Sequence, residues 1–282
     1  MKKVFSLVFF VSILIFTSIP TYAASIQIKV DGVVISSDVN PEIRNNRTMV
    51  PLRVISENLG AKVHWSNSEV TLTKNDMQVT LKQNSDTVIK NGNTELLDVK
   101  PYIKNGRTFV PIRFIAETFD CYVNYKDLTV TVDTKPLVID GKEVNSIQHE
   151  YRMTMGGIVQ QIKGNAYNQA IYDTFIENRG KKVDAPAYYS WHFNIDQPGS
   201  YTKVGQYDFM NTEGKSMKSY DIYTLVEAFP VEALAGYPKV LIHDATVNQW
   251  YLFTETGLQS INDLVNTASN NGFIKIISNT VV

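Results

Sequence analysis

A segment of the chain occurs twice with a spacing of 60 residues, and this repeat limits the folds open to the first half. The sequence PEIRNNRTMVPLR at residues 41–53 recurs as PYIKNGRTFVPIR at residues 101–113. Upstream, the turn dipeptide at residues 31–32 matches that at residues 91–92, and a third, partial start occurs at residues 139–141. Two similar units indicate one supersecondary structure used twice, in which neither unit buries its apolar face alone.

Each unit predicts a strand, a turn, a short helix and a β-hairpin, in that order. Pro51 and Pro111 suit the first helical turn, where a missing N–H group costs no hydrogen bond, and apolar residues follow at helical spacing. Gly60 can end the first helix in a left-handed conformation, and Asp120 stands at that place in the second. The hairpin of the first unit is expected around residues 66–68, between two stretches of alternating apolar residues.

Four arginines and two glutamates occupy equivalent positions in the two units. Guanidinium groups bind carboxylates in a bidentate manner, so the arginines could bind an anionic wall polymer. We favour the simpler interpretation, in which an arginine and a glutamate form a local ion pair that holds helix to sheet. The structural residues of the repeat are therefore expected to be Arg47, Pro51, Arg53, Glu57, Arg107, Pro111, Arg113 and Glu117.

The repeated residues resemble the copper amine oxidase N-terminal-like domain, often called a stalk domain. The resemblance rests on two copies of Arg-Thr-hydrophobic-Val-Pro-hydrophobic-Arg, each followed by Ile-x-Glu, and it covers residues 26–144. It implies a structural or wall-associated appendage of an exported bacterial protein. The resemblance implies that oxidase chemistry needs three copper-binding histidines and a modified tyrosine in an Asn-Tyr-Asp/Glu context. Here Asn124-Tyr125 is followed by Lys126, Tyr220-Asp221 is preceded by Ser219, and the four histidines are scattered. We therefore expect no amine oxidase activity and no cofactor.

The first 24 residues predict a secretory signal peptide. Two lysines precede an apolar stretch over residues 4–19, and Pro20 and the small residues Ala23 and Ala24 follow it. A membrane anchor is the alternative, but the stretch is short for a span of about 20 residues. The mature chain is therefore expected to be secreted or associated with the cell wall, with no membrane partner.

Charge and cysteine content exclude several classes of site. Lys and Arg number 27 and Asp and Glu number 28, so a net charge of -1 gives no reason to bind nucleic acid, which needs many cationic contacts. The single cysteine, Cys121, excludes disulfide frameworks and multi-cysteine metal sites, and its alignment with Ala61 predicts a small buried residue. His149 and Glu150 begin a zinc-protease motif that no second histidine completes.

Residues 145–282 predict a second domain, after the repeat domain of residues 25–144. Its pattern is typical of the α+β class, with helices on one face of a mainly antiparallel sheet. We expect a helix with a face from Ile158 to Phe175, a half-buried strand over residues 187–195, and a second helix over residues 258–268. Further strands are expected over residues 220–229, 240–245, 250–253 and 273–277.

Two sets of residues in this second domain are candidates for function. Eleven of the 15 tyrosines lie there, and amphipathic rings offer sugar rings or peptides a large contact area. Two His/Asp pairs, His192 with Asp196 and His243 with Asp244, could instead form a metal or acid–base site. The predicted ligand-binding residues are Tyr188, Tyr201, Tyr207, Tyr223, Tyr237 and Trp250.

Three functions remain open at this point. We expect an exported, non-catalytic envelope or extracellular protein, in which a stalk-like domain presents a second domain that binds a cell-wall polymer, a glycan or a surface protein. A secreted hydrolase that uses the two His/Asp pairs, with or without a metal ion, is the alternative, and a purely structural surface protein is the third. Proximity of the two pairs in one cleft would favour the enzyme, whereas tyrosines exposed on one face would favour the binding protein.

Overall fold

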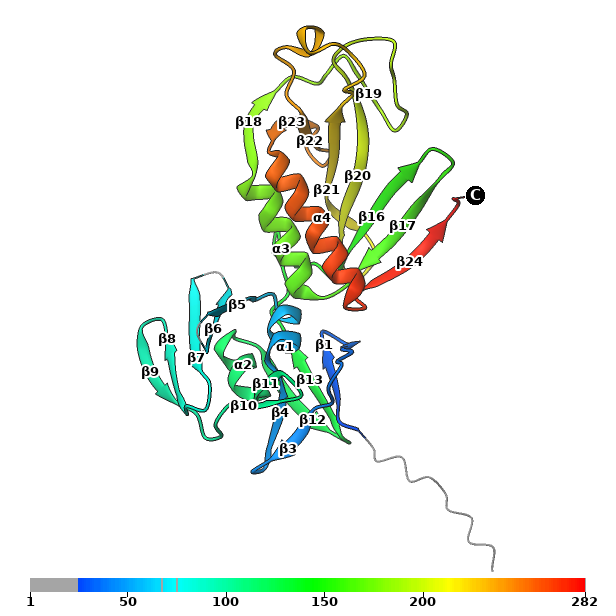
Figure 1. The fold of residues 1–282 in the computed structure, drawn as a ribbon. Helices are drawn as coiled ribbons and strands as arrows, with labels where there is room; N and C mark the ends of the chain where they lie inside the picture. Colours follow the sequence, from blue (N-terminus) through cyan, green and yellow to red (C-terminus); the bar gives the residue numbers. More distant parts are fainter. Residues whose placement is uncertain (1–24, 67, 75, 282) are drawn as a thin grey trace, which may run out of the picture.

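The computed structural model describes residues 25–66, 68–74 and 76–281, so the expected signal peptide lies outside the described residues. The described chain is mostly antiparallel sheet with four α-helices, in agreement with the α+β class. Figure 1 shows two parts placed end to end, with residues up to 145 in one and residues 146–281 in the other. Among the described residues, no helix has both the length and the apolar character that a membrane span needs.

A four-stranded sheet, with a helix after each of its inner strands, lies at the centre of the N-terminal part. In sequence order the elements are β3 (Glu42–Arg44), β4 (Arg47–Pro51), α1 (Leu52–Asn58), β10 (Tyr102–Lys104), β11 (Arg107–Pro111) and α2 (Ile112–Thr118). The inner strands run antiparallel, with Val50 opposite Val110, and β10, β11 and α2 begin and end 60 residues after β3, β4 and α1. Gly60 (φ 82°) and Asp120 (φ 56°) follow the helix ends in the expected left-handed conformation.

Two more sheets and a small hairpin complete the N-terminal part. The five-stranded sheet is antiparallel and follows sequence order through β5 (Lys62–Ser66), β6 (Glu69–Lys74), β7 (Met77–Lys82), β8 (Thr87–Lys90) and β9 (Asn93–Leu96). The four-stranded sheet has the order β12 (Tyr122–Lys126), β13 (Thr129–Asp133), β1 (Gln27–Val30), β2 (Val33–Val34), in which β1 and β13 are parallel. The hairpin joins β14 (Val138–Ile139) to β15 (Lys142–Glu143).

The C-terminal part is one nine-stranded sheet with α3 and α4 packed side by side on one face (Figure 1). The strand order is β18-β23-β22-β21-β20-β16-β17-β24, and β19 pairs with one end of β20. The elements are β16 (Ser146–Met153), β17 (Gly156–Ile162), α3 (Asn165–Glu177), β18 (Arg179–Val183), β19 (Tyr188–Ser190), β20 (Ser200–Met210), β21 (Ser216–Leu225), a 3-10 turn (Val231–Leu234), β22 (Val240–Asp244), β23 (Gln249–Phe253), α4 (Glu255–Asn270) and β24 (Ile274–Asn279).

Two sequence predictions in this part are wrong. Ile158 and Ile162 belong to strand β17, and the helix begins only at Asn165. Residues four apart share a face in a strand as well as in a helix, so their spacing does not separate the two. The strand expected over residues 187–195 has only three residues, because β16 takes the place beside β20 after residue 205. Strands β16, β18 and β20 are not predicted from the sequence.

A turn of the N-terminal part caps the first helix of the C-terminal part. Helix α3 begins after Gly164 without a side-chain cap of its own. The carboxylate of Asp31 accepts hydrogen bonds of 2.8 Å from the backbone N–H of Asn165 and from the N–H and hydroxyl of Thr134. The first N–H groups of a helix have no partner within the helix, so Asp31 supplies one from the other part.

Candidate functional site

The nine-stranded sheet has a helix-covered face and an opposite face, here called the open face. Tyr220 on β21 belongs to the helix-covered face, because its ring stacks on Phe175 of α3 at 4.6 Å. Successive residues of a strand point to opposite faces, so Asp221 lies on the open face. Cross-strand partners share a face, which places His243, paired with Asp221, on the open face and Asp244, paired with Tyr220, on the other.

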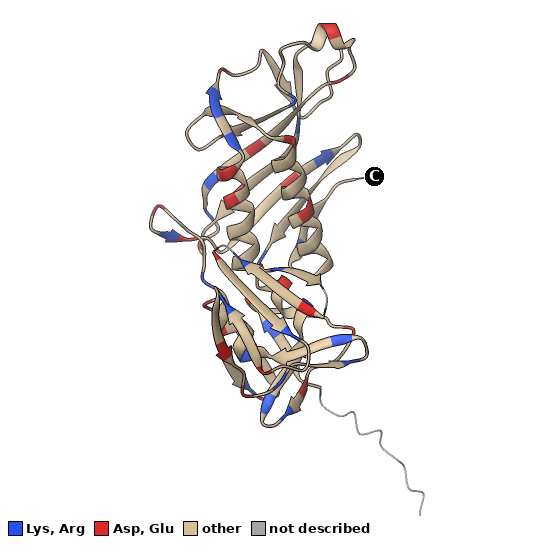
Figure 2. Cartoon of the chain, turned by 60° about the vertical axis from the view of Figure 1, so that its left-hand side comes forward, with Lys and Arg blue, Asp and Glu red and all other residues tan. Residues whose placement is uncertain are grey.

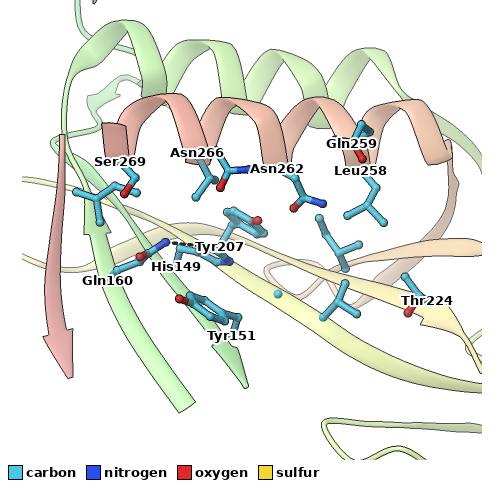
Figure 3. Close-up of a pocket in the computed structure, with 15 residues that line it drawn as sticks. His149, Tyr151, Gln160, Tyr207, Thr224, Leu258, Gln259, Asn262, Asn266 and Ser269 are labelled. Atoms are coloured by element: carbon cyan, nitrogen blue, oxygen red, sulfur yellow. Dashed lines mark hydrogen bonds between the residues drawn. The ribbon is translucent and has the colours of Figure 1, made fainter. Parts of the chain in front are cut away.

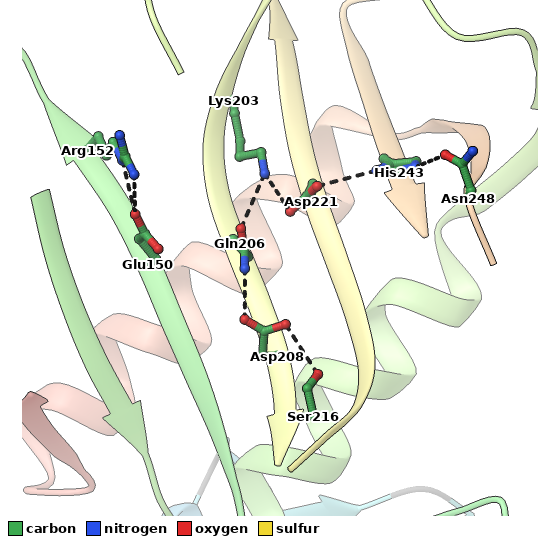
Figure 4. A network of polar contacts seen from close by, with 9 residues as sticks. All are labelled: Glu150, Arg152, Lys203, Gln206, Asp208, Ser216, Asp221, His243 and Asn248. Carbon is green, nitrogen blue, oxygen red and sulfur yellow. Dashed lines mark hydrogen bonds and ion pairs between the residues drawn. The ribbon is translucent and has the colours of Figure 1, made fainter. Parts of the chain in front are cut away.

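Polar side chains form a connected network on the open face (Figure 4). Nζ of Lys203 lies 2.9 Å from the carboxylate of Asp221, and that carboxylate lies 3.3 Å from Nδ1 of His243. Nε2 of His243 lies 2.9 Å from Oδ1 of Asn248, and the imidazole stacks on Trp250. Each charged group of this nearly buried set has a partner, which is what burial of a charge requires.

The predicted His/Asp pairs do not form within their own segments. His243 and Asp244 point to opposite faces, and Asp244 is buried against Lys218 at 2.5 Å. His192 and Asp196 lie in the exposed loop after β19, where their backbone N–H groups bond to neighbouring side chains. In the described parts of the chain, no three His, Cys, Asp or Glu side chains are grouped to hold a metal ion.

The partner that sequence reasoning missed for His243 is Asp221. The alternation of residues 220–229 indicates which residues share a face with Asp221. Its contact with His243, 22 positions later, depends on which strands are neighbours in the sheet. The order of the strands is not encoded in local periodicity.

Four of the six residues predicted to bind ligand are buried in the core. Tyr207 lies under α3 with its ring against Phe175, at 5.4 Å between centroids. Tyr201, Tyr223 and Trp250 form a separate apolar cluster with 3–4% of their surface exposed. Tyrosine and tryptophan fill this sheet because their apolar rings pack inside, so an exposed platform of all six residues is wrong.

The other two predicted residues, Tyr188 and Tyr237, are 42% and 45% exposed and line one concavity of about 680 Å³, here called the aromatic hollow. Tyr201 forms its wall and donates a hydrogen bond of 2.7 Å to the carbonyl of Pro238. Gly199 has φ 79°, and a Cβ there would lie 2.3 Å from the Tyr237 ring. The rim is polar, with Lys181, Asp184 and Gln197.

A second cavity of about 660 Å³ lies between α4 and the helix-covered face, here called the His149 cavity (Figure 3). The His149 ring stacks on Tyr207 at 4.2 Å, and its Nδ1 lies 3.0 Å from Nε2 of Gln160. Burial lowers the pKa of His149 to about 4, so the imidazole is neutral at pH 7. The sequence pattern around His149 indicates only an incomplete zinc-protease motif and gives no sign of this cavity.

The repeat arginines form ion pairs of two kinds. Arg53 pairs with Glu57 at 3.7 Å inside α1, and its counterpart in α2 has the same geometry, so these pairs do not hold helix to sheet. Arg47 reaches Asp98 at 2.5 Å and Arg107 reaches Asp38 at 2.6 Å, so each unit pairs with the loop that precedes the other. Figure 2 shows charges of both signs interspersed over both parts.

Two other residues of the N-terminal part lie as expected. Cys121 is buried, and desolvation raises the pKa of its thiol to about 11, so it is a small core residue. His64 is exposed on β5.

Comparison with known proteins identifies the first part of the chain. Residues 29–134 match the family described as copper amine oxidase N-terminal domain, which confirms the resemblance, and the C-terminal half has no family match. A Brevibacillus choshinensis protein named "Protease inhibitor" is 27% identical over 118 residues, or 41% of this chain. The matched segment spans only 36% of that relative's length. No solved structure matches the chain significantly.

Proposed function

We propose that this chain is an exported, non-catalytic binding protein whose C-terminal domain, residues 145–282, binds a cell-wall glycan at the aromatic hollow. Residues 25–144 serve as a duplicated, stalk-like domain that carries it. The family match supports the stalk, because it covers residues 29–134 and concerns the N-terminal domain of the oxidases. One observation carries the binding role: the two predicted tyrosines that are exposed, Tyr188 and Tyr237, line the same hollow.

The hollow has the chemistry that a sugar ring needs. Two exposed tyrosine rings offer apolar faces against which the C–H groups of a sugar can pack. Pro186, Pro198 and Pro238 restrict the backbone around them, which reduces the entropy lost on binding. Lys181 and Asp184 at the rim can exchange hydrogen bonds with sugar hydroxyls. Its volume of about 680 Å³ lies within the usual range of ligand pockets.

The hydrolase alternative has less support. The two members of a general acid–base pair must both reach the same bound substrate. His243 and Asp244 lie on opposite faces of the sheet, and the imidazole is engaged by Asp221 and Asn248.

Sedimentation with isolated bacterial cell walls tests the proposal. The chain from residue 25 onward is mixed with walls, and the bound fraction is measured over a range of protein concentration. We expect saturable binding that weakens about tenfold in Tyr188→Ala and in Tyr237→Ala, since each ring contact contributes about 1.5 kcal/mol. Tyr122→Ala is the matched control, because this tyrosine is 71% exposed in the N-terminal part. Unchanged binding in the double Tyr188→Ala, Tyr237→Ala variant would contradict the proposal.

Treatment of the walls separates glycan from protein partners. Walls stripped of protein by protease should bind as well as untreated walls. Loss of binding after protease treatment would show that the partner is a surface protein, and the glycan assignment would be wrong.

A further inference from the structure

The imidazole of His149 directs an unused donor into its cavity. With the amide nitrogen of Gln160 facing Nδ1, Gln160 donates to the ring, and the neutral tautomer that fits this arrangement carries its proton on Nε2. No protein acceptor lies within hydrogen-bond distance of this Nε2 among the described residues, although His149 is only 7% exposed. This donor faces the cavity, where water or a bound ligand can accept its hydrogen bond.

Local irregularities of the sheet keep the space around Nε2 open. The pairing of β20 with β21 shifts between Lys203 and Gly205, and that of β17 with β24 shifts between Val159 and Gln160. A Cβ at Gly205 would lie 3.3 Å from Nε2 of His149, so a larger residue would crowd this atom. Bulges and strand glycines of this kind occur where a ligand approaches the backbone.

Helix α4 lines the cavity with the apolar residues Leu258 and Val265 and with a row of exposed polar residues. Asn262, Asn266 and Ser269 lie four and three residues apart on its cavity side, below Gln259 (Figure 3). The sheet contributes Tyr151, whose side chain lies across the cavity from α4. Amide and hydroxyl groups both donate and accept, as sugar hydroxyls do.

The lining contains no Asp, Glu, Lys or Arg side chain. A charged ligand would therefore lose hydration without meeting a counter-charge. A wholly apolar ligand would leave the amides and Nε2 of His149 unpaired. The volume of about 660 Å³ is within the range of small-molecule sites.

We propose that the His149 cavity binds a neutral, hydroxyl-rich small molecule of the size of a mono- or disaccharide, to which Nε2–H of His149 donates a hydrogen bond. The site is separate from the aromatic hollow and does not depend on the function proposed for it.

Calorimetric titration of the chain from residue 25 onward tests this inference. The probes are glucose, N-acetylglucosamine and N,N′-diacetylchitobiose, with glucosamine and glucuronate as charged comparators. We expect at least one neutral sugar to bind with a Kd between about 10 μM and 1 mM, and the charged sugars to bind at least about tenfold more weakly. On binding, the ring resonances of His149 should shift in NMR spectra while those of His64 stay unchanged.

Substitutions on α4 locate the bound sugar without disturbing the core. The double variant Asn262→Leu, Asn266→Leu should lower affinity by about tenfold or more, because both residues are exposed on the cavity side. Asn270→Leu is the matched control, since Asn270 is exposed on the same helix outside the cavity. Absence of binding by every neutral sugar at millimolar concentration would overturn the inference.

The two proposed sites can fail separately. Sugar binding that survives the α4 double variant but is lost in Tyr188→Ala, Tyr237→Ala would place the sugar in the aromatic hollow and refute the role of the His149 cavity. Sugar binding lost only in the α4 variant, together with wall binding that no tyrosine substitution weakens, would support the cavity and refute the proposed function.

Discussion

Replacement of Asp31 by alanine should destabilise the whole chain, because this carboxylate joins its two parts. It accepts three hydrogen bonds of 2.8 Å, two from Thr134 and one from the first N–H of α3 at Asn165. A hydrogen bond of this kind contributes about 1 kcal/mol net when the carboxylate is partly exposed, so their loss costs about 3 kcal/mol. Asp31 also has φ 49°, and alanine in that conformation costs about 1 kcal/mol more.

Asp140 provides the matched control for this measurement. It has the same φ of 49° in an Asp-Gly turn, but its side chain is exposed and it makes no side-chain hydrogen bond within the described chain. Asp140→Ala should therefore cost only the backbone term of about 1 kcal/mol. The difference between the two variants isolates the three hydrogen bonds of Asp31.

Urea unfolding followed by tryptophan fluorescence measures both variants. Trp65 reports on the N-terminal part, and Trp191 and Trp250 report on the C-terminal part. Asp31→Ala should lower the free energy of unfolding by about 3 kcal/mol more than Asp140→Ala, with faster hydrogen exchange at the Asn165 amide. Equal destabilisation by the two substitutions would refute the reasoning that Asp31 caps α3 and joins the parts.

Two further predictions concern the C-terminal core. The folded pKa of His149, about 4, lies below its unfolded value of 6.5, so the unfolded chain binds more protons between these values. The stability that neutral His149 contributes is fully present above pH 6.5 and is lost as the pH falls to 4, by up to about 3 kcal/mol. In His149→Phe, the free energy of unfolding measured with urea should depend less on pH over this range. Phe175→Ala should cost about 3–5 kcal/mol in the same assay, because its side chain is fully buried, whereas Ile176→Ala, at a side chain 37% exposed, should cost less than about 1.5 kcal/mol; similar costs would contradict the packing of α3 described above.

The two short N-terminal helices could be predicted because the sequence contains two versions of them, whereas β3, β7 and β10 could not. Gly60 and Asp120 occupy equivalent positions in the two units. The strong helix-end signal of Gly60 therefore supports the weaker one of Asp120. Hairpin strands and α4 in the C-terminal part also follow from local periodicity. Strand β17 does not, because Ile158 and Ile162 fit two periods equally well.

The sites depend on contacts that local sequence does not encode. His149 meets Gln160 across a hairpin and Tyr207 across a third strand, and only the strand order brings them together. The predicted tyrosines differ in burial because strand order decides which of them are covered. Tyr223 lies on a central strand of the sheet and is buried, whereas Tyr237 lies in a loop and is exposed. Composition counts such residues but does not place them.

The parallel pairing of β1 with β13 also determines when the first sheet of the chain can form during synthesis. Gln27 lies opposite Thr129, so the first strand waits for a partner synthesised 102 residues later. At a synthesis rate of about 5–20 residues per second, that wait lasts about 5–20 s. Closing so long a segment is slow even when both strands are present, since the search carries an entropic cost. Over this interval β1 has only the short strand β2 as a partner, and its other edge stays unpaired until β13 is made.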